Sequence, residues 1–120
     1  MLYQGHDLNQ VIVVILQCLE DISVKRYYGV TTLLDVLRGS MSKDIVSKGL
    51  NEVEGYGKLT GVKREDLAFI VDWLISNGYI LRTKSRYPVL HHTNKGMKYH
   101  DNITLKQLQA LNRELEQTDT

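Results

Sequence analysis

With 120 residues, 42% of them hydrophobic and 24% charged, and a net charge of +1, the chain suits one globular domain and is too short for two. Its longest apolar run, VIVVIL, is too short to span a membrane, and no signal-peptide pattern opens it, so we expect a cytoplasmic protein with no membrane partner. One cysteine, Cys18, excludes an internal disulfide and a thiolate zinc site, and no nearby residue would activate it as a nucleophile.

Hydrophobic periodicity predicts helices in the first half of the chain. Apolar residues recur at the spacing of one helix face over residues 8–22, which indicates a helix of about four turns. A shorter helix is expected over residues 30–37 and should end at Gly39, because glycine readily takes the backbone conformation that ends helices. The segment KDIVSKGL predicts a third, short helix, and the glycines of EGYGKLTG predict a loop after it.

The second half of the chain predicts one strong helix and a β-hairpin. An apolar stripe over residues 67–75 indicates the helix, which the pair Asn77 and Gly78 should end. Two short strands are expected in YILRTK and PVLHHT, with a turn at residues 85–87 between them. Pro88 suits the end or edge of such a hairpin, because it cannot donate a ladder hydrogen bond.

Two threonines are expected to cap helix starts near the end of the chain. Thr93 can cap a turn that begins at Asn94, and Thr104 with Gln107 matches a capping box. A final amphipathic helix is predicted by the spacing of four leucines, Leu105, Leu108, Leu111 and Leu115.

The order of these elements is typical of a winged-helix domain, mostly α with a small β-hairpin whose turn is the wing. A generic α+β domain with an inert surface hairpin would have the same order. We divide the chain into a winged-helix domain, residues 1–103, and a C-terminal amphipathic helix, residues 104–120.

Charge is distributed unevenly along the chain. Residues 79–100 contain no Asp or Glu, and their five cations are Arg82, Lys84, Arg86, Lys95 and Lys98. Three histidines fall in the same stretch, while acidic residues gather elsewhere. This pattern predicts one positive face on the folded domain.

Four segments resemble the RQC domain, the winged-helix module of RecQ-type ATP-dependent DNA helicases: ILQCLED, KRYYGVTTLLDVLRGSMSKDI, GYGKLTG and LAFIVDWLISNGYILRTKSRYPVLHHTNKG. The resemblance runs from Leu8 to Lys98, and DVLRGS is its most specific part. It implies a domain that docks DNA duplex ends, forks or junctions and works beside a helicase core.

The same resemblance places the chemistry of the helicase outside this chain. RecQ-type helicases carry a four-cysteine zinc module before this domain and bind ATP and Mg²⁺ in their motor. The chain has neither part, so it is expected to be an excised module or a free-standing relative, with no cofactor and no catalytic residue. It departs from the family at His91 and His92, and its wing is short, as in bacterial members, which argues against carrying over the strand-separating role of longer wings.

The helix junction in DVLRGSMSK predicts a surface that binds phosphate. Free N–H groups at a helix start favour an anion, and glycine lets a phosphate come close. We expect this junction to contact the DNA backbone through Arg38, Gly39, Ser40, Ser42 and Lys43. Alternatively, Arg38 pairs with Asp35 or Asp44 and the serines only cap the next helix.

The wing supplies the other predicted DNA contacts. Lys84 and Arg86 would lie beside the phosphates of a duplex end or of a neighbouring strand. Tyr87 either stacks on an exposed base pair or packs down on the sheet. Lys58 and Lys63 either extend this basic surface or are ordinary solvated loop charges.

The helix over residues 67–75 occupies the place of a recognition helix. Its exposed side would show Glu65, Asp66, Asp72 and Ser76, which are poor partners for base edges in the major groove. We assign its large aromatic residues, Phe69 and Trp73, to the core or to an interface. A domain that reads DNA by shape and charge is therefore expected, rather than a sequence-specific repressor.

Two other functions stay open at this point. The chain could be a free-standing winged-helix transcriptional regulator that dimerises through its leucine-bearing tail, or a module that grips another protein. Catalysis has no sequence support, because GYGKLTG lacks the G-x-x-x-x-G-K-[ST] pattern of a nucleotide-binding loop. His91 and His92 are adjacent, so on a strand they would point to opposite faces and make a poor metal pair.

Overall fold

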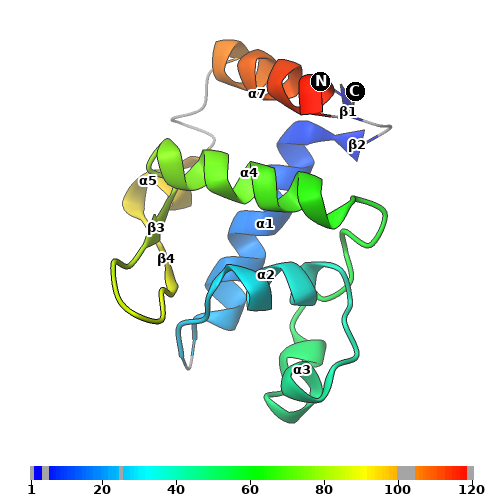
Figure 1. The fold of residues 1–120 in the computed structure, drawn as a ribbon, viewed down its shortest axis with the longest axis vertical. Helices are drawn as coiled ribbons and strands as arrows, with labels where there is room; N and C mark the ends of the chain where they lie inside the picture. The colour runs from blue at the N-terminus through cyan, green and yellow to red at the C-terminus, as the bar shows by residue number, and fades with distance from the viewer. Residues whose placement is uncertain (1, 4–5, 25, 100–104, 119–120) are drawn as a thin grey trace.

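The computed structural model describes residues 2–3, 6–24, 26–99 and 105–118 (Figure 1). Its helices are α1 (Leu8–Ile22), α2 (Val30–Leu37), α3 (Lys43–Ser47), α4 (Arg64–Ser76), α5 (Asn94–Met97) and α7 (Leu105–Thr118), with a 3-10 turn η1 (Leu50–Glu52). Its strands form two antiparallel pairs, β1 (Leu2–Tyr3) with β2 (His6–Asp7) and β3 (Ile80–Arg82) with β4 (Leu90–His92). The predicted winged-helix domain, mostly α with a small β-hairpin, is confirmed.

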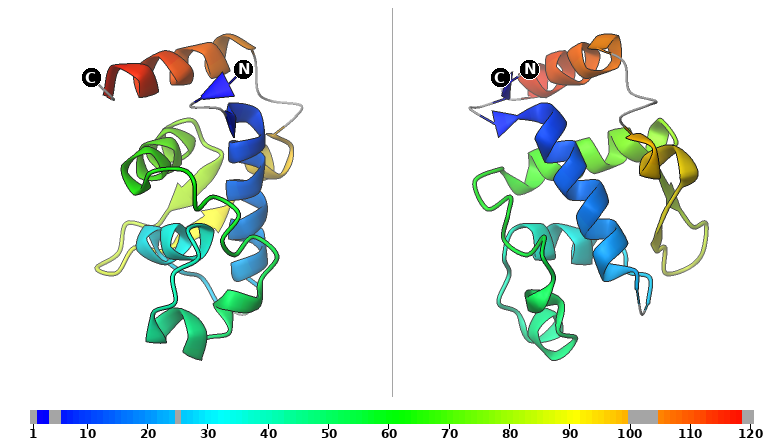
Figure 2. Two further views of the ribbon diagram at one scale, coloured as in Figure 1. Left: turned by 90° about the vertical axis from the view of Figure 1, so that its right-hand side faces the viewer. Right: turned by 180° about the vertical axis from the view of Figure 1, so that it is seen from behind.

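The first helix, α1, is the element against which α2, β4 and α7 pack (Figure 2). Its apolar positions from Leu8 to Ile22 form one buried face, as the periodicity predicted. Cys18 is fully buried within that face. Burial, reinforced by the Asp21 carboxylate, raises the pKa of the Cys18 thiol to about 12, so the thiol stays protonated and is a poor nucleophile.

The β3–β4 hairpin is shorter than predicted, with three residues in each strand. Its last ladder pair is Arg82 with Leu90. Next to that pair, Thr83 Oγ1 accepts a hydrogen bond from the Val89 N–H at 2.9 Å, while the Thr83 N–H donates to the Val89 carbonyl at 3.0 Å. A side chain thus replaces a backbone acceptor, and the loop of residues 84–88, here called the wing, leaves the sheet at this point.

The short helix α5 docks on the start of β3 through one threonine. Thr93 Oγ1 accepts from the Gly96 N–H at 2.9 Å, which confirms the predicted cap, and donates to the Gly78 carbonyl at 2.8 Å. The two elements are so close that a Cβ on Gly96 would overlap the Tyr79 carbonyl oxygen. Only glycine therefore fits at this position of α5.

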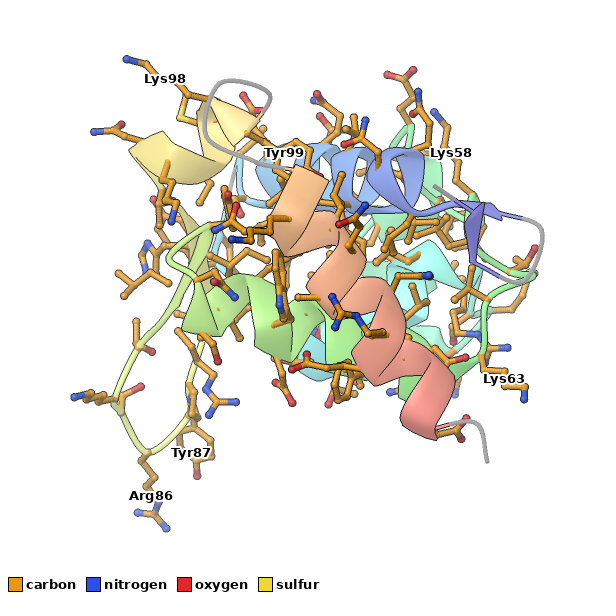
Figure 3. All side chains as sticks on the ribbon, turned by 90° about the horizontal axis from the view of Figure 1, so that it is seen from above. Lys58, Lys63, Arg86, Tyr87, Lys98 and Tyr99 are labelled. Atoms are coloured by element: carbon orange, nitrogen blue, oxygen red, sulfur yellow. The ribbon has the colours of Figure 1, made fainter. Side chains whose placement is uncertain are left out.

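The prediction of a single positive face over residues 79–100 is wrong for its second half. The ammonium of Lys95 donates to the Asn77 carbonyl at 2.6 Å and lies 4.6 Å from the Tyr79 ring centre, so it stabilises the end of α4. Lys98 lies at the opposite edge of the molecule from Arg86 (Figure 3). The cations that remain on the hairpin are Arg82, Lys84 and Arg86.

The last helix, α7, packs across α4 and α1. Leu108, Leu111 and Leu115 are buried in the same core as the rest of the domain, so the leucine-bearing face is already covered by this chain. The predicted capping box includes Thr104, which lies outside the described residues, and the division of the chain at residue 104 stays a prediction. Among the helices that the structure describes, none is both long and apolar enough to cross a membrane.

Candidate nucleic-acid interface

The end of α2 turns sharply at Gly39, as predicted. Gly39 has a φ angle of +72°, a left-handed conformation that glycine adopts without strain. Its N–H donates to the Val36 carbonyl at 3.1 Å, and the Ser40 N–H donates to the Asp35 carbonyl at 2.8 Å. These two bonds form a Schellman motif, which satisfies the last carbonyls of the helix. The chain then runs from residue 38 to 43 as a link to α3, here called the junction.

The glycine-rich loop fastens this junction, a contact that the sequence analysis missed. The Gly57 N–H donates to the Val36 carbonyl and the Leu59 N–H to the Leu37 carbonyl, both at 2.9 Å. In addition, the Tyr56 hydroxyl lies 2.9 Å from two of the junction carbonyls, those of Gly39 and Ser40. One signal was available in the sequence, the second glycine, Gly57, whose φ of +73° favours glycine. The two backbones meet closely here, because a Cβ on Gly39 would lie 3.3 Å from the Gly57 Cα.

Replacing Tyr56 by Phe is expected to lower the free energy of unfolding by about 1–2 kcal/mol, because two part-buried carbonyls lose their donor. Urea denaturation measures this change. The matched control is Tyr27→Phe, which removes a hydroxyl from a residue that is 44% exposed and should alter stability by less than about 0.5 kcal/mol. Equal effects of the two substitutions would show that the Tyr56 hydroxyl does not fasten the junction.

Arg38 is exposed and is held by its Nε rather than by a carboxylate. The Nε–H donates to the Val62 carbonyl at 3.2 Å, which fixes the plane of the guanidinium. Asp35 is paired instead with Arg64, at 2.6 Å from Oδ1 to Nη1. The alternative in which Arg38 pairs with Asp35 or Asp44 is therefore wrong, since neither ion pair occurs among the described residues.

The two serines differ from their predicted roles as caps. Ser42 takes the N-cap position of α3, but its hydroxyl makes no capping hydrogen bond, and Ser40 Oγ accepts from the Ser42 N–H at 3.3 Å instead. Because α3 has only five residues, few peptide dipoles align in it, and its start adds little attraction for an anion. Positive charge for a phosphate at the junction must therefore come from side chains, including the exposed Lys43.

The wing extends its side chains away from the body of the domain (Figure 3). Tyr87 is 77% exposed, so the alternative in which it packs down on the sheet is wrong. The Arg86 guanidinium lies 5.7 Å from the centre of the Tyr87 ring, within reach of a cation–π contact. Lys84 is exposed as well.

The junction and the wing lie at opposite ends of α2. At the N-terminal end of α2, next to the wing, the Leu90 N–H donates to the Tyr28 carbonyl at 2.8 Å, and Gly29 packs against the Pro88 carbonyl. The eight residues of α2 then span about 12 Å to the junction. In the left panel of Figure 2, the hairpin loop and α3 lie on the α2–α4 side of the molecule, with α1 on the other. The two predicted groups therefore share one side of the domain.

Comparison with known families agrees with this architecture. A family model described as the RQC domain matches residues 3–114. The chain belongs to the RQC domain family. This RQC domain is also 28% identical, over 92 residues, to the ATP-dependent DNA helicase RecQ of Bacillus subtilis (strain 168). The match covers 77% of the chain but only 15% of that relative. The resemblance inferred from the sequence is confirmed.

The surface of α4 in this RQC domain is acidic. Glu65 and Asp72 are exposed, as predicted, but Asp66 is 4% exposed, so its prediction as a surface residue is wrong. Phe69 and Trp73 pack against the core, which confirms their assignment. An α4 surface with exposed carboxylates is unsuited to a groove lined by phosphates.

Lys58 and Lys63, the two lysines considered as extensions of the basic surface, have different surroundings in the RQC domain. Lys58 pairs with Glu54 at 3.7 Å and lies on the far side of the molecule from the wing (Figure 3). Lys63, by contrast, is exposed and directly follows Val62, whose carbonyl holds Arg38. Only Lys63 is placed to extend the junction.

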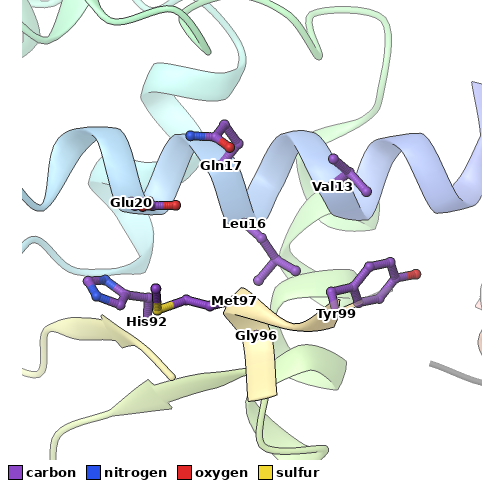
Figure 4. Close-up of a pocket in the computed structure, with 8 residues that line it drawn as sticks. All are labelled: Val13, Leu16, Gln17, Glu20, His92, Gly96, Met97 and Tyr99. Atoms are coloured by element: carbon purple, nitrogen blue, oxygen red, sulfur yellow. The ribbon is translucent and has the colours of Figure 1, made fainter. Parts of the chain in front are cut away.

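A cavity of about 150 Å³ opens between α1 and the β4–α5 segment (Figure 4). His92 lines it, whereas His91 stacks on Tyr27, so the two histidines point to opposite faces of β4, as predicted. None of the residues predicted to contact DNA lines this cavity. Contact with DNA stays a prediction for the residues of the junction and the wing.

Proposed function

We propose that this RQC domain docks forked DNA or duplex ends for a RecQ-type ATP-dependent DNA helicase, through contacts with the sugar–phosphate backbone. ATP hydrolysis and unwinding belong to other parts of such a helicase. The proposed contacts lie in the junction, at Arg38, Gly39, Ser40, Ser42 and Lys43, and in the wing, at Lys84, Arg86 and Tyr87.

The observation that carries this proposal is the state of Arg38. Its Nε–H donates to a backbone carbonyl and the side chain is exposed, so the terminal nitrogens of an oriented guanidinium remain for a ligand. The Asp35 carboxylate, three positions away in the sequence, is paired with Arg64. A guanidinium in this condition suits a bidentate contact with phosphate oxygens, and such contacts position a protein on DNA without reading sequence.

Two observations favour docking by shape over the alternative of an operator-binding dimer. The exposed carboxylates of α4 would meet phosphates unfavourably if the helix entered a groove. Three leucines of α7 that a dimer would need, Leu108, Leu111 and Leu115, are buried within the chain. A selection for preferred DNA sequences should accordingly return no consensus.

The test is to titrate labelled forked, duplex and single-stranded DNA with the domain at several salt concentrations. The proposal expects binding that weakens steeply with salt and that favours forks and duplex ends over closed duplex. Absence of binding at low salt would refute it, and a selected consensus sequence would favour the transcriptional alternative.

Replacing Tyr87 by Ala is expected to weaken binding to open duplex ends about tenfold, because stacking on a base is worth about 1–3 kcal/mol. Tyr87→Phe keeps the ring and should bind as the wild type does. A dumbbell duplex, closed at both ends by hairpin loops, offers no terminal base pair and should be bound equally by all three proteins. A tenfold loss on the dumbbell as well would contradict stacking.

A further inference from the structure

The outward face of the hairpin carries a row of apolar and aromatic side chains. Ile80 and Leu90 point into the core, so Leu81 and His91, which are paired across the ladder, face outward. Tyr27, from the turn between α1 and α2, covers His91 with a ring-to-ring distance of 3.8 Å and an interplanar angle of 33°. We call Tyr27, Leu81 and His91 the outer platform.

The outer platform is exposed although its members are apolar or aromatic. Leu81 is 56% exposed and Tyr27 is 44% exposed. Since His91 lies against one part of the Tyr27 ring, the exposed part offers a flat surface on which another ring could stack.

The surroundings of the platform indicate what kind of ligand would bind. The platform is built from two chain segments, residues 22–34 and 73–100, and neither contains an Asp or a Glu. The segments are joined where the Leu90 N–H donates to the Tyr28 carbonyl. Exposed cations adjoin the platform along the chain in both segments: Arg26 precedes Tyr27, and Lys84 follows Leu81 by three residues. Arg82 pairs with the core-facing Leu90, so it lies on the other face of the hairpin. Aromatic surface next to cations is the combination that binds single-stranded nucleic acids.

We propose that the outer platform binds an unpaired nucleotide of single-stranded DNA, on the strand that leaves a duplex end held at the wing. The inference rests on the proposed function, and it names a second surface of the same hairpin. The base stacks on Tyr27, Leu81 contacts the base or sugar, and Arg26 lies within the same segment to meet a phosphate. Cations on the platform's borders favour a nucleotide over an apolar protein segment.

The experiment compares three DNA ligands: a fork with two single-stranded arms, a blunt duplex of the same paired sequence, and an oligo-dT strand. The fork carries 2-aminopurine at its first unpaired position, whose fluorescence is quenched by stacking. Tyr27→Ala should weaken binding to the fork and to oligo-dT about tenfold and abolish the quenching. Its affinity for the blunt duplex should change less than twofold, and Tyr27→Phe should match the wild type throughout.

A second variant tests the outer platform even if Tyr27→Ala fails to fold. Arg26→Gln should lower the slope of log affinity against log salt by about 0.7 on oligo-dT and leave the slope on blunt duplex unchanged. Equal losses on all three ligands, or no loss on the fork, would overturn the platform. Wild-type binding to oligo-dT but not to duplex would refute the proposed function and support the platform, whereas binding to neither would refute both.

Discussion

The double variant Arg38→Ala/Lys84→Ala is expected to bind forked DNA about thirtyfold more weakly than the wild type. One cation is removed from the junction and one from the wing, and each solvent-exposed charge pair with a phosphate contributes up to about 1 kcal/mol. The slope of log affinity against log salt should also fall by about two units, one for each lost phosphate contact. Fluorescence anisotropy titrations from low to physiological salt measure both quantities.

A matched control separates local contacts from net charge. Lys58→Ala/Lys106→Ala removes the same two charges, but Lys58 is paired with Glu54 away from the wing, and Lys106 is exposed on α7. This variant should bind within about twofold of the wild type and keep its salt slope. If both double variants lose affinity equally, general attraction rather than the junction and wing explains the binding.

Gly96→Ala is expected to lower the free energy of unfolding by about 3 kcal/mol, the upper end of the range for a side chain forced into a packed site. The new Cβ would overlap the Tyr79 carbonyl oxygen, so α5 must move away from β3. That movement would also break the bonds from Thr93 Oγ1 to the Gly78 and Tyr79 carbonyls. Urea denaturation followed by circular dichroism measures the loss.

The control for this variant is Gly49→Ala. Gly49 has a φ angle of +70° but no atom within 4 Å of an added Cβ, so only backbone strain of about 1 kcal/mol is expected. A smaller loss for Gly96→Ala than for Gly49→Ala would contradict the close approach of α5 and β3.

The helices of this domain could be predicted because their signals are local. The buried face of α1 follows directly from the spacing of its apolar residues, and α2 ends at the glycine that makes its Schellman motif. The hairpin was predicted at the correct place, but its strands were predicted too long, because the sequence does not show that the Thr83 side chain would replace a backbone acceptor.

The candidate site was predicted only in part, since its geometry depends on contacts between distant residues. The sequence suggested Arg38, three positions away, as a partner for Asp35, whereas the fold brings the distant Arg64 to it. Likewise, Tyr56 reaches the junction across 16 and 17 residues of chain. Asp66 and Lys95 are polar residues that the fold places partly or fully in the interior, and hydrophobic periodicity does not predict such positions.

The attachment of α2 at both ends has a consequence for selectivity. Hydrogen bonds fix one end to the hairpin and the other to the glycine-rich loop, so the two cationic groups cannot shift independently. Little conformational freedom would be lost when a ligand engages both, which favours affinity. A ligand whose backbone geometry differs from the preferred one would have to deform or lose one group of contacts. The rigidity of α2 would therefore select among nucleic acids by their shape.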